Sequence, residues 1–313
     1  MNQEKHYNTL TEYYLNKYNS KVAKIALNAN FTCPNRDGTK GYGGCTYCSK
    51  LGSGDTAGDV TLSLAEQYNQ IKTIILKKWK TAQFIPYLQA YSNTYAPLQT
   101  LKKIYESILK VDPEHIVEFS IATRADCFTK EVYDYLEELN RNIPLTIELG
   151  LQSSNEETGK RIHRQLTNDE FITCVKELHK RNIQVVVHII NGLPEETKED
   201  MLKTIDFIND LDVEGIKIHS LLLLKHTLLY EEYLKKPFPI LSLEEYVEIV
   251  TQQIAKLKPS ILIHRLSADG VLEDLVEPKW AIKKLVVMNE IDKHLRKWNI
   301  YQGDNFKQSS HHH

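Results

Sequence analysis

Three of the five cysteines of this chain lie close together in the stretch CPNRDGTKGYGGCTYC, which covers residues 33–48. Cys45 and Cys48 form a Cx2C pair, which lets two thiolates converge on one metal ion or cluster. Eleven residues separate Cys33 from Cys45, and the glycines at positions 38, 41, 43 and 44 allow tight backbone conformations. The spacing therefore predicts a loop wrapped around an inorganic group.

Three kinds of chemistry fit such a loop. A structural zinc site usually takes four protein ligands, and the loop contains no histidine that could complete the set. A redox-active Cx2C pair would leave Cys33 without a role. An iron–sulfur cube held by three cysteines would keep one iron open for a substrate or cosubstrate. The spacing alone leaves these alternatives open, although an odd count of five cysteines disfavours a disulfide framework.

Apolar, β-branched runs that alternate with amphipathic segments must position this loop. Strands are predicted at residues 22–29, 84–92, 116–123, 145–152, 183–192, 215–224 and 261–267, and helices at 62–80, 130–142, 168–182, 198–210, 243–257 and 278–298. Continuous apolar strands between helices indicate a parallel sheet that is buried on both faces. We predict an α/β fold, a partial (β/α)6 barrel of the TIM type with a C-terminal α/β extension. A doubly wound sheet is the alternative, but no GxGxxG follows the first strand.

The chain divides into four predicted parts. Residues 1–21 form an N-terminal helical segment, residues 22–235 form the barrel, and residues 236–307 form the extension, which begins near the two prolines of KKPFPILS. Residues 308–313, which end in HHH, are expected to derive from a purification tag.

Polar residues recur where the predicted strands end. In parallel barrels, reacting groups lie at the carboxyl ends of strands and in the loops that follow. A single buried polar group is more often structural, but agreement among several strands favours a shared polar cavity. Glu148 and Gln152 are four residues apart on one strand and so share a face. The candidates are Ser92, Asn93, Arg124, Glu148, Gln152, His188, Asn191, His219, Lys225, His264 and Arg265, whereas Cys174 is expected in the core and Cys127 follows the third strand.

Composition excludes other classes. With 313 residues and a net charge of −2, the chain has no overall basic field for nucleic acid. No apolar run is long enough to span a membrane, and the N-terminus lacks the apolar core of a signal peptide. We therefore expect a cytoplasmic protein without a membrane partner.

Several stretches resemble the radical SAM superfamily, and in particular the bacterial YhcC/YtqA group, which is related to the radical SAM domain of the Elongator catalytic subunit. These stretches are NFTCPNRDGTKGYGGCTYC, QAYSNTYAPL, TRADC, ELGLQSSNEETGKRIHR, NGLPEET and HRLSADG, and the similarity spans about residues 5–303. The commonest spacing in the superfamily is Cx3Cx2C, and the longer first gap is a feature of the Elongator branch. The resemblance implies a [4Fe–4S] cluster whose open iron binds S-adenosylmethionine (SAM).

The resemblance also implies roles for individual residues. The ligands of the cluster would be Cys33, Cys45 and Cys48, and Tyr47 would pack near the adenine of SAM. Ser92 and Asn93 stand where a GGE-like motif grips the methionine amino group, although the acidic residue is missing here. Arg164 matches an arginine that pairs with the methionine carboxylate. Further cofactor contacts are expected from Arg124, Glu148, Gln152, His188 and Asn191, and substrate contacts from His219, Lys225, His264 and Arg265.

The activity implied is reductive cleavage of SAM to a 5′-deoxyadenosyl radical, which abstracts hydrogen from a substrate. The Elongator resemblance implies the C5 side chain of the tRNA wobble uridine as that substrate, and flavodoxin or ferredoxin as the electron donor. Lysines and arginines of the last predicted helix could contact RNA phosphates: Lys279, Lys283, Lys284, Lys293, Arg296 and Lys297. The alternatives are a radical SAM enzyme for a small metabolite and a non-catalytic Fe–S or zinc protein that binds tRNA.

Overall fold

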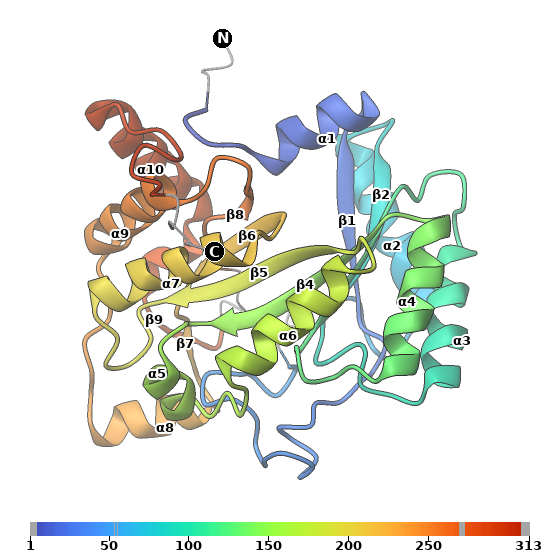
Figure 1. The fold of residues 1–313 in the computed structure, drawn as a ribbon, viewed down its shortest axis with the longest axis horizontal. Coiled ribbons are helices and arrows are strands. Elements are labelled where there is room, and N and C mark those ends of the chain that lie inside the picture. Colours follow the sequence, from blue (N-terminus) through green and yellow to red (C-terminus); the bar gives the residue numbers. More distant parts are fainter. Residues whose placement is uncertain (1–4, 53, 55, 269–272, 308–313) are drawn as a thin grey trace, which may run out of the picture. The chain divides into compact units, whose positions relative to one another are not determined.

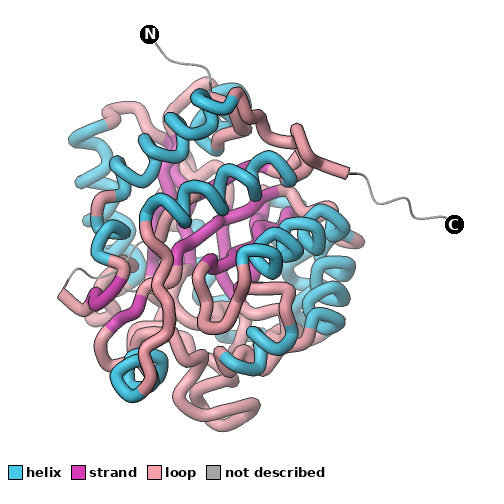
Figure 2. The backbone as a smooth tube through the Cα atoms, turned by 90° about the vertical axis from the view of Figure 1, so that its left-hand side faces the viewer, coloured by secondary structure: helices cyan, strands magenta, loops and turns pink. Residues whose placement is uncertain are grey.

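The computed structural model describes residues 5–52, 54, 56–268 and 273–307. The expected tag residues 308–313 lie outside the described residues. Helices and strands alternate along the chain (Figures 1 and 2). The helices are α1 (Leu10–Tyr18), α2 (Leu64–Lys78), α3 (Leu98–Leu109), α4 (Lys130–Asn142), α5 (Glu156–Arg161), α6 (Asn168–His179), α7 (Lys198–Leu211), α8 (Leu228–Lys235), α9 (Leu243–Lys256), the 3-10 helix η1 (Lys279–Ile282) and α10 (Lys284–Trp298). The strands are β1 (Val22–Leu27), β2 (Gln83–Leu88), β3 (Phe119–Thr123), β4 (Leu145–Gln152), β5 (Gln184–Asn191), β6 (Gly215–Ser220), β7 (Leu223–Leu224), β8 (Leu262–Arg265) and β9 (Leu275–Glu277).

Seven strands form one sheet in the order β1-β2-β3-β4-β5-β6-β8, which follows the chain without a reversal. The pairs β1–β2, β2–β3, β3–β4 and β6–β8 are parallel. A doubly wound sheet needs a reversal of strand order at its switch point. Right-handed crossovers that always step in one direction instead place the helices on one face of the sheet, as in a barrel. The predicted partial barrel is therefore confirmed, and the doubly wound alternative is wrong.

Two predicted strands have different bounds in the structure. The strand predicted at 84–92 ends at Leu88, so Ser92 and Asn93 belong to the loop that follows it. The strand predicted at 215–224 divides into β6 and β7, and β7 pairs antiparallel with β9 in a second sheet. The run SLLLL looks in the sequence like part of one continuous strand, because local periodicity does not reveal where a strand changes its pairing partner. Helices α3, α5 and α8 and strand β9 are absent from the sequence prediction.

The chain forms two compact units, which we describe separately. The cysteine unit consists of Thr11–Gly150 and Gln165–Val186, and the C-terminal unit consists of the residues up to Leu10, Leu151–Arg164 and the residues from Val187 onward. Strands β4 and β5 contribute residues to both units. The domain boundaries that we predicted at residues 21 and 235 stay a prediction.

In the cysteine unit, β1 is buried on one face and carries the charged Lys24 on the other. Ala23, Ile25 and Leu27 of β1 are buried, whereas the residues between them are partly exposed. Tyr105 of α3 packs edge-on against Phe119 of β3, with ring centroids 5.4 Å apart. Such alternation is the pattern of a strand whose two faces meet different surroundings.

In the C-terminal unit, the two ends of the described chain pack together. The ring of His6 stacks on Tyr301 with centroids 4.0 Å apart, and Thr9 bridges Ile263 beside β8. Helix α9 packs against α7 and α10 (Figure 1). These contacts fix the extension that follows residue 235 to the last strands of the sheet.

Candidate functional site

The loop after β1 holds the three clustered cysteines in a compact turn structure. The amides of Arg36 and Asp37 donate to the carbonyl of Cys33 at 2.8 and 3.2 Å, and the Cys48 amide donates to the Cys45 carbonyl at 3.0 Å. Gly38, Gly43 and Gly44 have φ values of 92°, 79° and 85°, which side chains rarely adopt. The glycines therefore do what the spacing predicts: they let the loop fold back between its first and second cysteines.

The thiols of this loop differ from the other cysteines in exposure. Cys33, Cys45 and Cys48 are partly exposed, whereas Cys127 and Cys174 are buried. The pKa of Cys45 is raised to about 11, by burial first and also by the charges of Cys48 and Cys33, while Arg124 and an amide contact from Asn35 at 3.5 Å oppose the rise. Three neighbouring thiolates repel one another, and a positively charged inorganic group would offset this repulsion. Cysteines bind such a group only in their deprotonated form.

The described residues contain no set of three or more His, Cys, Asp or Glu side chains that could hold a single metal ion. In a [4Fe–4S] cube each thiolate binds a different iron, so the sulfurs lie farther apart than around one ion.

Arg124, directly after β3, is held beside the loop by a carboxylate. Its Nε and Nη2 donate to Asp126 at 2.9 and 2.8 Å, and Lys40 pairs with the same carboxylate at 2.8 Å. Burial raises the pKa of Asp126, but these two cations outweigh it and lower that pKa overall. The Arg124 cation also interacts with the thiolates of Cys45 and Cys33. The predicted candidate Arg124 thus lies at the cysteine loop.

Ser92 and Asn93 lie in the loop after β2 and are fully buried. The Asn93 side-chain amide donates to the carbonyls of Ala122 and Leu88 at 2.8 and 3.2 Å, while its Oδ1 has no partner among the described residues. The Ser92 amide donates to the carbonyl of Thr32, in the cysteine loop, at 3.2 Å. An acceptor oxygen buried without a donor is costly, so it indicates a ligand that donates.

Tyr47 and Cys127 also interact with the cysteines. Burial raises the pKa of the Tyr47 hydroxyl, and the thiolate of Cys45, with which it interacts directly, adds to the shift. Burial likewise raises the pKa of Cys127, whose thiol lies 3.7 Å from Asp126 Oδ1. The predicted contact of Tyr47 with adenine stays a prediction.

Glu148, whose side chain is completely buried, pairs with Lys24 of β1. Ser120 donates to the same carboxylate at 2.9 Å, and the Lys24 ammonium lies 4.8 Å from the centre of the Tyr87 ring. Lys24 is a functional candidate that the sequence analysis missed. A lysine inside an apolar strand was the signal, because such a charge needs a partner. Gln152 ends β4 in a left-handed conformation with φ 68°.

Arg164, in the C-terminal unit, is 2% exposed and anchors a loop. Its Nη1 donates to the carbonyls of Leu151 and Ser153 at 3.1 and 2.6 Å, and its Nη2 pairs with Glu156 at 3.1 Å. These contacts tie the end of β4 to the start of α5. A contact of Arg164 with the methionine carboxylate stays a prediction.

His188 and Asn191 of β5 are three residues apart and therefore point to opposite faces of the strand. The His188 ring lies 5.4 Å from the ring of His219 in β6. The Asn191 side chain exchanges two hydrogen bonds with Gln253 of α9, at 2.8 and 2.9 Å. The sequence analysis placed both residues in one cofactor site, and the structure gives them separate surroundings.

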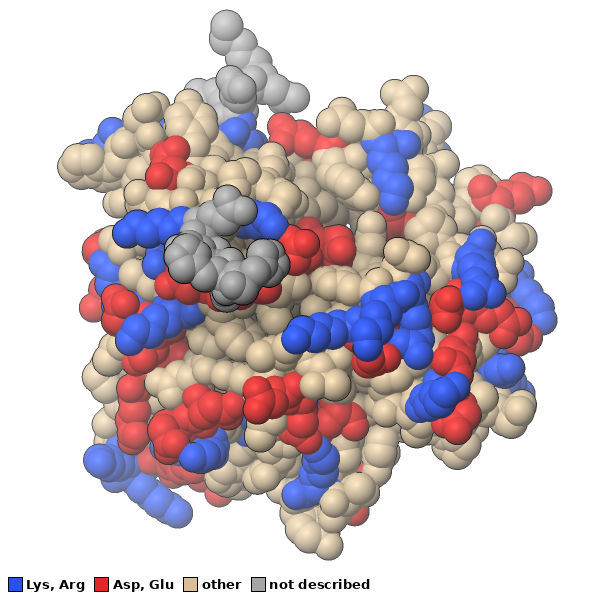
Figure 3. All heavy atoms as spheres, viewed as in Figure 1, with Lys and Arg blue, Asp and Glu red and all other residues tan. Residues whose placement is uncertain are grey.

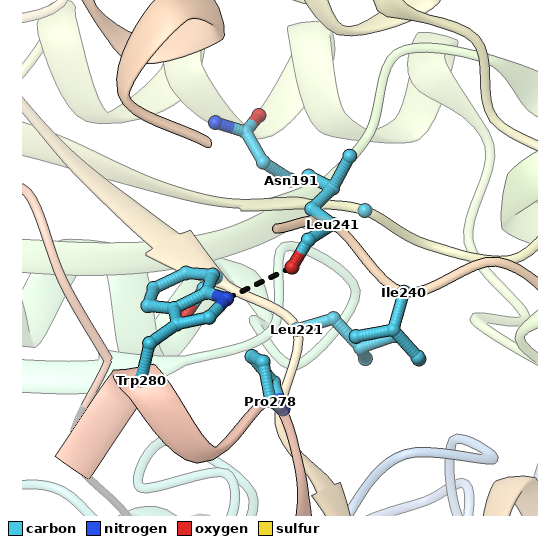
Figure 4. A pocket seen from close by; sticks show the side chains of 8 residues that line it. Asn191, Leu221, Ile240, Leu241, Pro278 and Trp280 are labelled. Carbon is cyan, nitrogen blue, oxygen red and sulfur yellow. Dashed lines mark hydrogen bonds between the residues drawn. The ribbon is translucent and has the colours of Figure 1, made fainter. Parts of the chain in front are cut away.

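Asn191 also lines a small pocket in the C-terminal unit (Figure 4). The Trp280 indole donates to the carbonyl of Leu241 at 2.9 Å across this pocket, which Leu221 and Pro278 border. Two predicted substrate residues lie elsewhere in the unit. Lys225 follows β7 and donates to the carbonyl of Glu273 at 3.0 Å. Burial lowers the pKa of Lys284, and the charge of Arg265 lowers it further.

Comparison with known proteins identifies the class of this chain. The family profile described as the Radical SAM superfamily matches residues 33–208, and the profile of the Radical SAM C-terminal domain matches residues 213–297. A three-cysteine loop after the first strand of a partial barrel is what this family would present. The chain belongs to the radical SAM superfamily, whose members use a [4Fe–4S] cluster and SAM.

Individual proteins and structures within this superfamily are also similar to the chain. The chain is 43% identical over 306 residues to "Uncharacterized protein YtqA" of Bacillus subtilis, covering 98% of this chain and 94% of the relative. It is 26% identical over 130 residues to a tRNA-2-methylthio-N(6)-dimethylallyladenosine synthase of Fusobacterium nucleatum, covering 41% of this chain and 29% of the relative. The structure of the archaeal Methanocaldococcus infernus Elp3 superimposes with a TM-score of 0.66 at 18% identity, covering 90% of this chain and 64% of that chain. The expected resemblance is confirmed, and the Elp3 likeness concerns the fold alone.

The structure also bears on the membrane prediction. Within the described ranges, no helix is both long and apolar enough to cross a bilayer.

Proposed function

We propose that this radical SAM enzyme modifies tRNA, at the C5 side chain of the wobble uridine. Support for a tRNA substrate comes from the relative whose name states that it acts on tRNA, although that similarity covers only 41% of this chain. The uridine itself rests on the resemblance of the motifs to the Elongator branch. We propose further that the enzyme works in the cytoplasm with a flavodoxin or ferredoxin as electron donor.

The residues of the chain bind and orient the cofactors in this proposal. When bound, the reduced cluster and SAM supply a 5′-deoxyadenosyl radical that abstracts hydrogen from the substrate. Cys33, Cys45 and Cys48 hold the cluster. Asn93 Oδ1, the buried acceptor without a partner among the described residues, accepts a hydrogen bond from the methionine ammonium. This amide oxygen stands in for the acidic residue that the GGE-like position lacks, and it is the observation that carries the cofactor assignment.

The other predicted contacts complete the proposal. Glu148, which pairs with Lys24, is proposed to accept a hydrogen bond from a ribose hydroxyl or from the methionine moiety. Tyr47, Ser92, Arg124, Gln152, Arg164, His188 and Asn191 are proposed as further SAM contacts, and His219, Lys225, His264 and Arg265 as substrate contacts.

Surface charge constrains how RNA would dock. Lys and Arg side chains are interspersed with Asp and Glu over the face shown in Figure 3. In α10, Lys293 pairs with Glu290 at 3.2 Å, and Lys279 of η1 donates to the carbonyl of Leu275 at 2.7 Å. Phosphate contacts would therefore be local, and binding should show a shallow dependence on salt.

The test is SAM cleavage with and without tRNA. The reconstituted enzyme, dithionite and SAM are incubated with bulk tRNA from a strain that lacks the gene, and 5′-deoxyadenosine and the digested nucleosides are measured by mass spectrometry. We expect tRNA to stimulate cleavage at least tenfold and one uridine derivative to change. The Cys45→Ala variant should lose its iron and all 5′-deoxyadenosine.

Two outcomes would contradict parts of the proposal. Basal cleavage without any response to tRNA would exclude the tRNA substrate and leave the radical SAM assignment intact. A change confined to an adenosine derivative would exclude the wobble uridine.

A further inference from the structure

Arg36 lies three residues after Cys33 and reaches across the loop to the last cysteine. Its Nη2 donates to the Cys48 carbonyl at 3.3 Å and to the Ser49 carbonyl. The guanidinium carbon lies 5.5 Å from the centre of the Tyr91 ring, in the loop after β2. These contacts hold the cation at a fixed place beside the cysteine loop.

The packing around this side chain is specific for it. Gly44 has a φ of 85°, and a Cβ there would lie 2.9 Å from Arg36 Nε. Tyr91 adopts a left-handed φ of 61°, and its hydroxyl donates to the Lys50 carbonyl at 2.6 Å. A glycine and a strained tyrosine therefore enclose the guanidinium from two sides. Backbone strain of this kind persists only where the surroundings hold it.

The charge of Arg36 is balanced differently from that of the other cations near the loop. Arg124 and Lys40 both pair with the Asp126 carboxylate. Within the described part of the chain, Arg36 forms no ion pair with a carboxylate, and its electrostatic partners are Cys48, Tyr91 and Cys33. Burial lowers the pKa of Arg36, but Cys48 first, and then Tyr91 and Cys33, raise it overall.

We propose that Arg36 is a positioning residue that raises the reduction potential of the cluster. Reduction adds one negative charge to the cluster and its three thiolates. A cation held at a fixed place nearby stabilises that extra charge, and because Arg36 and the cysteines are partly buried, solvent screens the interaction only in part. Net charge and hydrogen bonding around the sulfurs are among the factors that set the potential of iron–sulfur proteins. The inference concerns the cofactor that the family uses and does not depend on the substrate.

The experiment measures the midpoint potential of the reconstituted cluster by redox titration followed by electron paramagnetic resonance, without SAM or tRNA. Iron content and the thermal unfolding of the iron-free protein are measured alongside. Arg36→Gln should bind iron and lower the ratio of reduced to oxidised cluster about tenfold at a given potential, which is about 59 mV for one electron. Arg36→Lys, which keeps the charge, should recover most of the potential.

Two further variants separate charge from structure. Arg141→Gln removes an exposed arginine of α4 that pairs with Glu137, and it should leave the potential unchanged. Asp126→Asn removes a negative charge in the loop after β3, beside Arg124 and Lys40, and should raise the potential by a similar factor. If Arg36→Gln fails to take up iron, the potential of Asp126→Asn tests whether charge near the loop sets the potential of the cluster.

The proposal is overturned if iron-loaded Arg36→Gln has the wild-type potential. It is also overturned if Arg36→Gln takes up no iron and Asp126→Asn leaves the potential unchanged. A potential that falls equally in Arg36→Lys and Arg36→Gln would assign the effect to the hydrogen bonds of the guanidinium rather than to its charge.

Discussion

Glu196, in the NGLPEET stretch, carries a buried carboxyl group that holds its proton to a higher pH than an exposed glutamate does. The Ser153 hydroxyl donates to its Oε1, while its Oε2 has no partner among the described residues. Burial is the main cause that raises the pKa of Glu196 from 4.5 to about 7; the bond from Ser153 opposes the rise, and the charge of Asp200 contributes to it. Because the folded state binds this proton more tightly than the unfolded state, the group favours folding in acid.

The pH dependence of stability follows from this sign. Between pH 4.5 and 7 the folded state holds more protons than the unfolded state, so the contribution of Glu196 should fall as the pH rises through this window. Glu196→Gln should remove the slope and raise the free energy of unfolding at pH 8 by at most about 3 kcal/mol. Denaturant unfolding of the iron-free protein at pH 5 and pH 8 measures both. Glu157→Gln, at a glutamate whose side chain is 80% exposed, serves as control and should change neither value. An unaltered slope in Glu196→Gln would refute the assignment.

Arg164 is expected to serve the fold whether or not it also binds SAM. Replacing it by alanine removes a buried guanidinium and its bonds to the carbonyls of Ser153 and Leu151, of which the Leu151 carbonyl keeps the Ser153 amide as donor. The loss should be about 2–4 kcal/mol of unfolding free energy. Arg164→Lys should recover less than half of it, because an ammonium lacks the planar fork.

Two measurements separate the roles of Arg164. Chemical unfolding of the iron-free protein reports the structural role, and equilibrium dialysis of SAM with the iron-loaded protein reports binding. Arg161→Ala, at the end of α5 and three residues before Arg164, is the matched control, since its side chain is 31% exposed. If Arg164→Ala unfolds like the wild type but binds SAM weakly, the structural role is wrong; if it binds SAM normally, the carboxylate contact is wrong.

Between elements, the pair Asn191–Gln253 joins the end of β5 to α9. Gln253 also donates to the Met201 carbonyl of α7 at 3.1 Å, so one buried amide connects three elements. Asn191→Ala should cost about 1–3 kcal/mol, because the Gln253 amide would lose both bonds to its partner. A double-mutant cycle with Gln253→Ala should give a coupling energy of about 1 kcal/mol or more. Gln252→Ala, on the exposed side of α9, is the control; a coupling near zero would mean that the two amides act independently.

The sequence predicts the regular elements of this chain better than their ends. Apolar runs placed all seven predicted strands at strands of the main sheet, since buried parallel strands lack polar interruptions. The short pair of β7 and β9 could not be predicted, because it joins Leu224 to Leu275 and neither segment has a periodicity of its own. Helix α3 begins directly after Pro97, a usual first-turn signal that the sequence analysis passed over.

For the whole molecule, the cysteine spacing and the family motifs identified the chemistry. The sequence did not predict which residues pair with the buried polar and charged side chains. The partner of Glu148 is a lysine 124 residues away, and that of Asn191 is a glutamine 62 residues away. Only a fold brings such positions together, and local patterns carry no information on them. The face assignments of His188 and Asn191 were within reach, because three residues along a strand reverse the direction of a side chain.

The Lys24–Glu148 pair has a consequence for how the chain is made. A ribosome adds about 5–20 residues each second, so roughly 6–25 s separate the synthesis of these two residues. Throughout that interval the nascent β1 carries a lysine whose counter-charge does not yet exist, and enclosing it alone would be costly. Lys24 of β1 must therefore stay in contact with water until β4, with Glu148, has been synthesised. The order of translation thus sets the order in which this face of the cysteine unit is buried.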